Sequence, residues 1–365
     1  MISRLFDIVS RRIDGPLMVS IVLTLALGLT VVYSASGAAS FDRVLGQGRN
    51  IAFAAGALWV VANIPPQALM RLAVPVYSAG LALLVGVALF GEVRNGARRW
   101  LNLGFTTLQP SEVMKIAVPL VLAWYFHRHQ EGIQLRNYAV AAILLALPVG
   151  LIVRQPDLGT ALLVFASGFF VIFLAGLSWR VLGGLLVSGL VSLPFLWGML
   201  HDYQRKRVLT LLDPTEDPLG AGYHIIQATI AIGSGGVLGK GWLNGTQAQL
   251  DFVPERSTDF ILAVFGEEFG LAGNLVLLVL YMLIVGRGLM IAANASTTFA
   301  RLTAGAVTLT FFTYAFVNMG MVSGILPVVG VPLPMVSYGG TALLSMLTGF
   351  GILMSISTHK QLVSS

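Results

Sequence analysis

Ionisable side chains occur at the ends of several long apolar stretches of this chain, where such groups are costly and are candidates for function. Glu112 and Lys115 stand three residues apart at the start of one stretch, so on a helix they share a face and can form an ion pair. Asp259 stands at the start of another stretch. A carboxylate at a wet boundary could accept a proton from a substrate hydroxyl, provided that it reaches the hydroxyl and has a suitable pKa.

Each of these groups also has a structural interpretation, which the residues alone leave open. Glu112 and Lys115 could be an ordinary ion pair at a helix start. Asp157 and Asp259 could cap the helices that follow them, since aspartate is favoured at that position. Burial would raise the pKa of the Asp259 carboxyl, whereas a helix N-terminus and nearby arginines would lower it.

Glu267 and Glu268 follow Asp259 by eight and nine residues. Along one continuous helix they would therefore lie roughly 12 Å deeper than Asp259. Two neighbouring carboxylates cannot both face lipid, so we expect them to form a structural polar network between helices.

Two further segments interrupt the apolar pattern. The glycine-rich segment 232–242 fails the phosphate-loop pattern, because Gly241 follows the lysine where Ser or Thr belongs. We expect its glycines to allow tight turns and a close approach of backbones. Pro327, Pro332 and Pro334 fit a re-entrant loop or broken helix that lines a cavity, or else an ordinary proline-rich turn.

The composition indicates a membrane protein. Of the 365 residues 56% are hydrophobic and 10% are charged, whereas soluble domains carry about 25% charged residues. We predict an all-α integral membrane protein that forms a single polytopic domain, residues 1–365, because lipid-exposed backbone must form its hydrogen bonds internally. About ten spans are predicted, near 16–34, 49–63, 72–91, 112–127, 137–153, 157–175, 180–199, 258–285, 303–324 and 336–357.

The absence of cysteine excludes disulfides and thiolate metal sites, and the five histidines form no HExxH pattern. The net charge of +6 could suggest a nucleic-acid partner. However, the chain has no run of basic residues, and its charges lie near the expected membrane edges. Anionic lipid or an anionic headgroup is therefore the expected partner, and nucleic acid is not.

The connections between the spans predict the topology. Residues 201–257 form one long polar connection, a length typical of functional loops. An even number of spans puts both termini on one side, and the short loops of that side carry ten Lys and Arg against six on the other. The excess places the termini in the cytoplasm and 201–257 outside. The ten are Arg4, Arg11, Arg12, Arg71, Arg128, Arg136, Arg180, Arg287, Arg301 and Lys360.

Positive charges on the predicted outer side could form a basic mouth for an anionic substrate, or could simply contact lipid headgroups. The short outer loops contribute Arg43, Arg49, Arg94, Arg98, Arg99 and Arg154. The long loop adds Arg205, Lys206, Arg207, Lys240 and Arg256. Up to this point a transporter, a lipid flippase and a membrane transferase all remain open.

A series of motifs resembles the SEDS family of peptidoglycan glycosyltransferases, in order and over nearly the whole chain. The resemblance is closer to the elongation-associated RodA branch than to the division-associated FtsW branch. The motifs are NGARRWL at 95–101, LQPSE at 108–112, RQPDLGT at 154–160, DP at 213–214, DPLG at 217–220, GYHIIQ at 222–227, GTQ at 245–247, PER at 254–256, VPLP at 331–334 and SYGG at 337–340.

The resemblance implies polymerisation of lipid II into β-1,4-linked glycan strands at the outer face of the bacterial cytoplasmic membrane, for cell elongation and rod shape. It gives Asp259 the position of the catalytic carboxylate, and Glu112, Lys115 and Asp157 positions in a polar cavity. It gives Trp100 the position of an essential aromatic side chain. The other residues expected in the cavity or at the substrate are Arg98, Arg99, Arg154, Arg205, Arg207, Lys240, Glu255 and Ser337.

The family works with a class B penicillin-binding protein, which is a transpeptidase, and with membrane proteins of the rod complex, so these partners are expected. No cofactor is required, and a divalent cation at the pyrophosphate is left open. Two other functions stay as alternatives: a flippase or transporter for lipid II, and a non-catalytic scaffold of the wall-synthesis complex.

Overall fold

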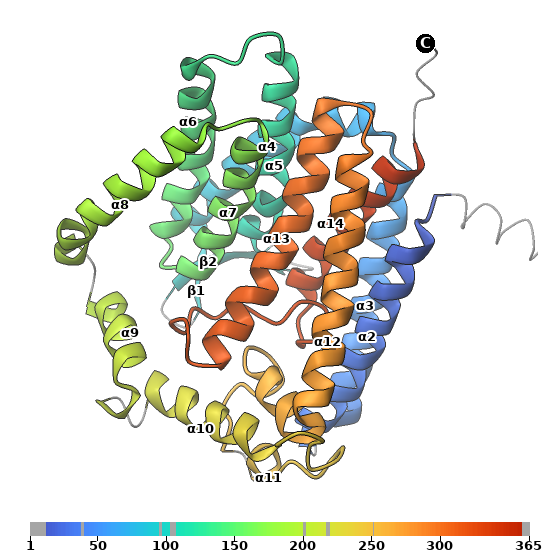
Figure 1. Cartoon of the computed structure of the whole chain (residues 1–365), viewed down its shortest axis with the longest axis vertical. Helices are drawn as coiled ribbons and strands as arrows, with labels where there is room; N and C mark the ends of the chain where they lie inside the picture. The colour runs from blue at the N-terminus through green and yellow to red at the C-terminus, as the bar shows by residue number, and fades with distance from the viewer. Residues whose placement is uncertain are drawn as a thin grey trace, which may run out of the picture.

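The computed structural model describes residues 12–37, 40–94, 97–102, 107–199, 202–216, 220–250 and 252–359. These residues form an almost entirely helical bundle, as expected (Figure 1). The long helices are α2 (Gly15–Ala35), α3 (Ser40–Ala62), α4 (Pro66–Phe90), α5 (Pro110–Arg128), α6 (Leu135–Val153), α7 (Leu158–Leu174), α8 (Trp179–Met199), α12 (Ile261–Ala293), α13 (Thr298–Val322) and α14 (Gly340–Thr358).

Each of the ten predicted stretches falls on one of these helices within the described residues. By length and composition six of them, α2, α4, α6, α12, α13 and α14, could cross a membrane. Helix α7 and residues 179–195 of α8 are shorter apolar helices. The helix predicted to begin at residue 49 is longer than expected, because α3 begins at Ser40. Its first turns carry the charged residues Asp42, Arg43 and Arg49, so a prediction from apolar stretches leaves these turns out of the helix.

The chain between α4 and α5, expected to be a loop, forms a small antiparallel sheet. Its strands are β1 (Glu92–Arg94), β2 (Ala97–Asn102) and β3 (Thr107–Leu108), in the order β1-β2-β3. Glu92 pairs with Trp100 and Val93 with Arg98. The hairpin therefore gives Arg98 and Arg99 a fixed backbone, which contacts α4 and α5.

The two ends of the described chain meet at one end of the bundle, as an even number of spans requires (Figure 1). Ser357 Oγ at the end of α14 donates a hydrogen bond of 2.7 Å to Asp14 Oδ2 at the start of α2. Arg287 of α12 binds both oxygens of the same carboxylate, at 2.9 and 2.7 Å. We call this end, which carries Asp14 and Ser357, the terminal end of the bundle.

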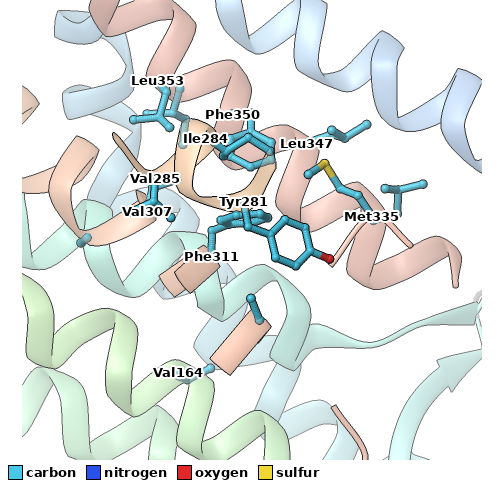
Figure 2. Close-up of a cluster of buried hydrophobic side chains, with 14 of the residues drawn as sticks. Val164, Tyr281, Ile284, Val285, Val307, Phe311, Met335, Leu347, Phe350 and Leu353 are labelled. Atoms are coloured by element: carbon cyan, nitrogen blue, oxygen red, sulfur yellow. The ribbon is translucent and has the colours of Figure 1, made fainter. Parts of the chain in front are cut away.

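The core of the bundle is apolar and is built around α13. Phe311 of α13 packs edge-on against Tyr281 of α12 and against Phe350 of α14, with ring centroids 5.3 Å apart in both pairs (Figure 2). Edge-to-face contacts of this kind are favourable because the positive ring edge meets the negative ring face. This core fixes the relative positions of the three helices that surround the site described below.

Helix α8 leaves the bundle (Figure 1). Leu185, Val187, Leu190 and Phe195 all expose more than half of their side chains, and they lie on different faces of the helix. A helix that is apolar all round is stable only where lipid or protein covers it. The segment therefore suits a lipid-facing position.

Residues 201–257 were expected to form a polar loop, but most of the described part is helical. It contains α9 (Asp202–Leu212), the short 3-10 helix η2 (Pro214–Glu216), α10 (Ala221–Ser234) and α11 (Thr246–Gln249). Helix α10 packs on α12 and α13, because its apolar residues recur on one side. The long connection is thus a folded cover at the end of the bundle opposite the terminal end.

The glycine-rich segment after α10 lies directly against the backbone of α12, which confirms the close approach expected from its sequence. The amides of Lys240 and Gly241 donate to the carbonyls of Glu267 and Glu268, both at 3.0 Å. Gly239 has φ +79°, and a Cβ atom there would collide with the backbone of Glu268. Only glycine fits such a position without strain.

The chain reverses at Gly270 inside α12, where φ is 63° and ψ is −160°. Ser257, which precedes the reversal, lies at the level of Gly28 of α2. Its carbonyl accepts a hydrogen bond of 2.8 Å from Tyr338 N. Met335 and Val336, just before Tyr338 in the chain, lie against Gly28. Glu268, nearer the reversal, accepts a hydrogen bond from Ser34. Ser34 follows Gly28 by six residues of α2, which is about 9 Å along the helix.

The expectation that Glu267 and Glu268 lie deeper than Asp259 is therefore wrong. It assumed one continuous helix, whereas the segment 261–269 runs from the interior toward the end of the bundle and returns after Gly270. The network expected of these carboxylates is present. Glu267 Oε1 is bound by Lys240 Nζ at 2.7 Å and by Gln247 N at 3.0 Å, and the residue is completely buried.

Candidate active site

Asp259 lies just before the first residue of α12, in the interior of the bundle. Phe260 is the N-cap residue of α12, so the alternative that Asp259 caps this helix is not supported. The carbonyl of Asp259 accepts a hydrogen bond of 2.8 Å from Asn318 Nδ2, which also donates to the carbonyl of Val331 at 2.7 Å. Among the described residues none donates a hydrogen bond to the carboxylate, which lies against Gly330. Asp259 is thus held in place through its backbone.

The proline-rich segment is a re-entrant loop, and it positions the residues just before Asp259. Ser337 Oγ donates to the carbonyl of Thr258 at 2.6 Å and accepts from Leu333 N at 2.7 Å. Tyr281 of α12 donates to the carbonyl of Pro334 at 2.6 Å. The burial of Val331, Leu333 and Ser337 favours this interpretation over an ordinary proline-rich turn.

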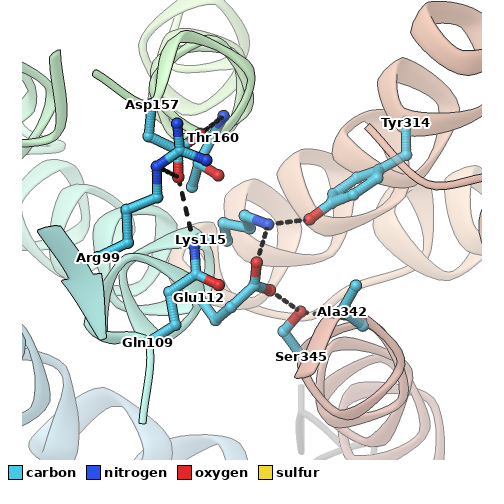
Figure 3. A network of polar contacts seen from close by, with 9 residues as sticks. All are labelled: Arg99, Gln109, Glu112, Lys115, Asp157, Thr160, Tyr314, Ala342 and Ser345. Carbon is cyan, nitrogen blue, oxygen red and sulfur yellow. Dashed lines mark hydrogen bonds and ion pairs between the residues drawn. The ribbon is translucent and has the colours of Figure 1, made fainter. Parts of the chain in front are cut away.

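A second polar group joins α5, α13 and α14 inside the bundle (Figure 3). Lys115 Nζ lies 2.6 Å from Glu112 Oε1 and also donates to Tyr314 Oη. Ser345 Oγ donates to Glu112 Oε2 at 2.8 Å. Lys115 is only 7% exposed, so the ion pair is buried and not a surface pair. A buried pair is stable only when further hydrogen bonds satisfy it, as Tyr314 and Ser345 do here.

Asp157 combines both roles that the sequence left open. Its Oδ1 accepts from Thr160 N at 3.2 Å and caps α7. Its Oδ2 accepts from Gln109 Nε2 at 3.3 Å and lies 3.8 Å from Arg99 Nε (Figure 3). Arg99 Nη2 also donates to the carbonyl of Pro156 at 2.5 Å. This cluster connects β2 to the start of α7 beside the Glu112–Lys115 pair.

The remaining predicted site residues have different surroundings. Lys240 is bound to Glu267, and its Nζ also donates to Thr246 at 2.8 Å, so it holds the folded cover together. Arg205 donates to the carbonyls of Trp197 and Gly198, at 3.0 and 2.8 Å. Neither residue is shown near Asp259.

Other predicted residues lie at the surface. Arg98, Arg154 and Glu255 are exposed, and Trp100 is half-buried on β2. Glu255 accepts a hydrogen bond of 2.8 Å from Thr258 Oγ1. The side chain of Arg207 lies outside the described part of the structure.

The sequence interpretation missed Tyr314, Asn318 and Ser345. All three lie within stretches that were treated as plain spans. Tyr314 and Asn318 stand four residues apart and hence on one face of α13. Polar groups at that spacing within an apolar stretch are a signal that could have been recognised.

Comparison with known proteins agrees with this architecture. Residues 16–362 match the family model of FtsW, RodA and SpoVE cell cycle proteins. The peptidoglycan glycosyltransferase MrdB of Escherichia coli strain K12 is 52% identical over 356 residues, which cover 97% of this chain and 95% of that protein. The probable peptidoglycan glycosyltransferase FtsW of Geobacter metallireducens is 36% identical, over 96% of each chain.

Solved structures are similar as well. A chain of a peptidoglycan synthase complex, studied for the coordination of polymerization and crosslinking, superimposes with a TM-score of 0.82 at 32% identity, over 95% of this chain and 99% of that one. The rod shape determining protein RodA of Thermus thermophilus gives 0.73 at 28% identity, over 95% of this chain and 98% of that one. The protein belongs to the FtsW/RodA/SpoVE family of cell cycle proteins, also known as the SEDS family.

Proposed function

We propose that the protein is a peptidoglycan glycosyltransferase of the RodA type, which polymerises lipid II into β-1,4-linked glycan strands for cell elongation. The observation that carries the proposal is the Asp259 carboxylate. It lies in the interior of the bundle, it accepts no hydrogen bond from a described residue, and buried polar groups lie on the neighbouring helices. The similarity to a named glycosyltransferase over nearly the whole chain supports it.

In the proposed reaction the 4-hydroxyl oxygen of an acceptor GlcNAc attacks the anomeric carbon of the donor MurNAc. The new C–O bond forms as the bond from that carbon to the diphosphate oxygen breaks, which inverts the carbon. Asp259 takes the hydroxyl proton, and undecaprenyl pyrophosphate leaves with the bonding electrons. Arginines such as Arg99 suit the stabilisation of the leaving diphosphate, because guanidinium groups bind phosphate oxygens in pairs.

We further propose a topology in which the ten long helices cross the cytoplasmic membrane as a single domain with both termini in the cytoplasm. The meeting of the two described ends supports an even number of spans. Asp259 and the folded cover 201–257 then lie toward the extracytoplasmic side, where lipid II is polymerised. The excess of Lys and Arg on the terminal side supports the same orientation.

A class B penicillin-binding protein and other membrane proteins of the rod complex are the proposed partners. The similar chain in a peptidoglycan synthase complex supports the first of these. The reaction as proposed needs no cofactor from the protein. Among the described residues no group of three or more His, Asp and Glu is placed to hold a metal ion. Whether a divalent cation assists at the substrate diphosphate is tested with the chelator below.

The test is polymerisation of purified lipid II by the full-length protein, with and without its transpeptidase partner and with and without a chelator. Asp259→Asn removes the base and should abolish polymer, whereas Asp42→Asn, at an exposed position of α3, should not. Polymerisation by Asp259→Asn at the normal rate would reject Asp259 as the base. Transfer of fluorescent lipid II between leaflets with no polymer under any condition would favour a flippase instead.

A further inference from the structure

Three neighbouring cavities meet at the terminal end of the bundle, far from Asp259. The first has a volume of about 610 Å³ and is lined by Met70, Arg71, Val74, Trp124, His127 and Arg128. The second, of about 130 Å³, shares Met70 and His127 with it, and the third, of about 410 Å³, shares His127 and Arg128. His127 at the end of α5 therefore lies where all three join.

The charge of the first cavity is entirely positive. Its wall contains the guanidinium groups of Arg71 from α4 and Arg128 from α5, and none of its lining residues is acidic. Arg128 lies over the ring of Trp124, 5.0 Å from its centroid, which orients the guanidinium. Neither arginine forms an ion pair with another described residue. Glu131 lines the third cavity but not the first. The two like charges in the first cavity therefore favour an anionic occupant.

The rest of the wall is apolar. Met70, Val74 and Trp124 line the cavity beside the two arginines. Val74 and the neighbouring Leu72 of α4 are 37% and 44% exposed. An occupant thus meets cationic groups at the end of the helices and an apolar surface further along them. This arrangement matches a phospholipid, whose phosphate lies at the membrane surface and whose acyl chains continue inward.

His127 provides a separate observation. Its Nδ1 is buried and has no hydrogen-bond partner among the described residues. A buried ring nitrogen without a partner is costly unless a ligand or water binds it. His127 lines the wall of the first cavity together with the two arginines.

We propose that Arg71, Arg128 and His127 bind the phosphate of an anionic phospholipid at the terminal end of the bundle, with its chains against Met70, Val74 and Trp124. The site goes beyond the proposed glycosyltransferase function and shares no residue with the candidate active site. Basic pockets between helices at the cytoplasmic face are a recognised type of lipid-headgroup site. A free phosphate would use the same guanidinium groups but would leave the apolar wall without a role.

The experiment is native mass spectrometry of the delipidated full-length protein with phosphatidylglycerol, phosphatidylethanolamine or inorganic phosphate. We expect phosphatidylglycerol to be retained and phosphatidylethanolamine to be lost at the same collision energy. Each of Arg71→Gln and Arg128→Gln should weaken retention about fivefold, and the double variant more. The matched control is Arg180→Gln, which changes another exposed arginine, on α8, that lines none of these cavities.

Three outcomes would overturn the proposal. These are equal retention of the two lipids, equal weakening by Arg180→Gln, and displacement of the lipid by an equimolar amount of inorganic phosphate. Both cavity arginines are exposed, so their variants should fold, and thermal unfolding checks this. If a glutamine variant fails to fold, Arg128→Lys and Arg71→Lys replace it. Lysine keeps the positive charge but cannot form the paired hydrogen bonds of a guanidinium group. Unchanged lipid retention in both lysine variants would contradict binding through the guanidinium groups.

Discussion

Tyr314 and Asn318 lie one turn apart on α13, and each supports a different part of the candidate active site. Tyr314 Oη accepts a hydrogen bond from Lys115, and Asn318 Nδ2 holds the carbonyl of Asp259 at 2.8 Å. Side chains four residues apart on a helix are neighbours, so α13 fixes the buried ion pair and the proposed base relative to one another. The rigid face of one helix thus sets the geometry of groups that come from α5 and from the start of α12.

The first prediction concerns this support. Tyr314→Phe removes one acceptor of the buried Lys115 ammonium, which should cost about 1 to 3 kcal/mol of stability. Polymerisation of lipid II should also slow, because Lys115 then has more freedom to move. Thermal unfolding and initial polymerisation rates measure the two effects. Phe312→Leu, at an exposed apolar position of the same helix, is the control. An unchanged rate in a Tyr314→Phe protein that is measurably destabilised would show that the hydrogen bond between Lys115 and Tyr314 is not needed for catalysis.

How far the sequence predicts this structure depends on the range of the interactions. The apolar stretches predict the long helices, because burial in lipid is a property of each stretch by itself. The Glu112–Lys115 pair was predictable from spacing within one helix, and its distance of 2.6 Å confirms it. Tyr314 and Ser345 join that pair from other helices, and only the packing brings them there.

The errors have the same physical origin. Glu267 and Glu268 were placed deeper than Asp259 because α12 was taken to be continuous, whereas Gly270 reverses it. A glycine can either continue a helix or adopt a positive φ, and its identity does not decide between them. Lys240 was expected to face an anionic substrate, but the backbone contact of its own segment with α12 brings it to Glu267 instead.

The two roles of Asp157 can be separated by comparing serine with alanine. Serine retains the ability to cap α7 but has no charge for Arg99, whereas alanine loses both. We expect Asp157→Ala to lower stability by about 1 kcal/mol and Asp157→Ser to change it little. Both should reduce polymerisation if the contact with Arg99 matters. Normal activity in Asp157→Ser would leave capping as the whole role of the residue.

The contact between the glycine-rich segment and α12 predicts a steric effect. Gly239→Ala should strongly destabilise the protein, because its φ is +79° and a Cβ would meet the backbone of Glu268. Gly233→Ala, in α10, is the matched control, since no atom lies within 4 Å of the position of its Cβ. It should be neutral or slightly stabilising. Thermal unfolding of the two variants side by side measures the difference, and equal stability would be incompatible with the close backbone contact.

The carboxylate that joins three helices at the terminal end should make stability depend on pH. Burial would raise the pKa of Asp14, but hydrogen bonds from Arg287, Ser357 and Leu17 lower it below its usual value. A lowered pKa contributes stability above the pKa of the unfolded chain, about 3.9, and the contribution is lost as pH falls toward the folded value. Asp14→Asn should therefore destabilise the protein at neutral pH and have less effect near about pH 3. Unfolding midpoints at both pH values test this, and a pH-independent difference would contradict it.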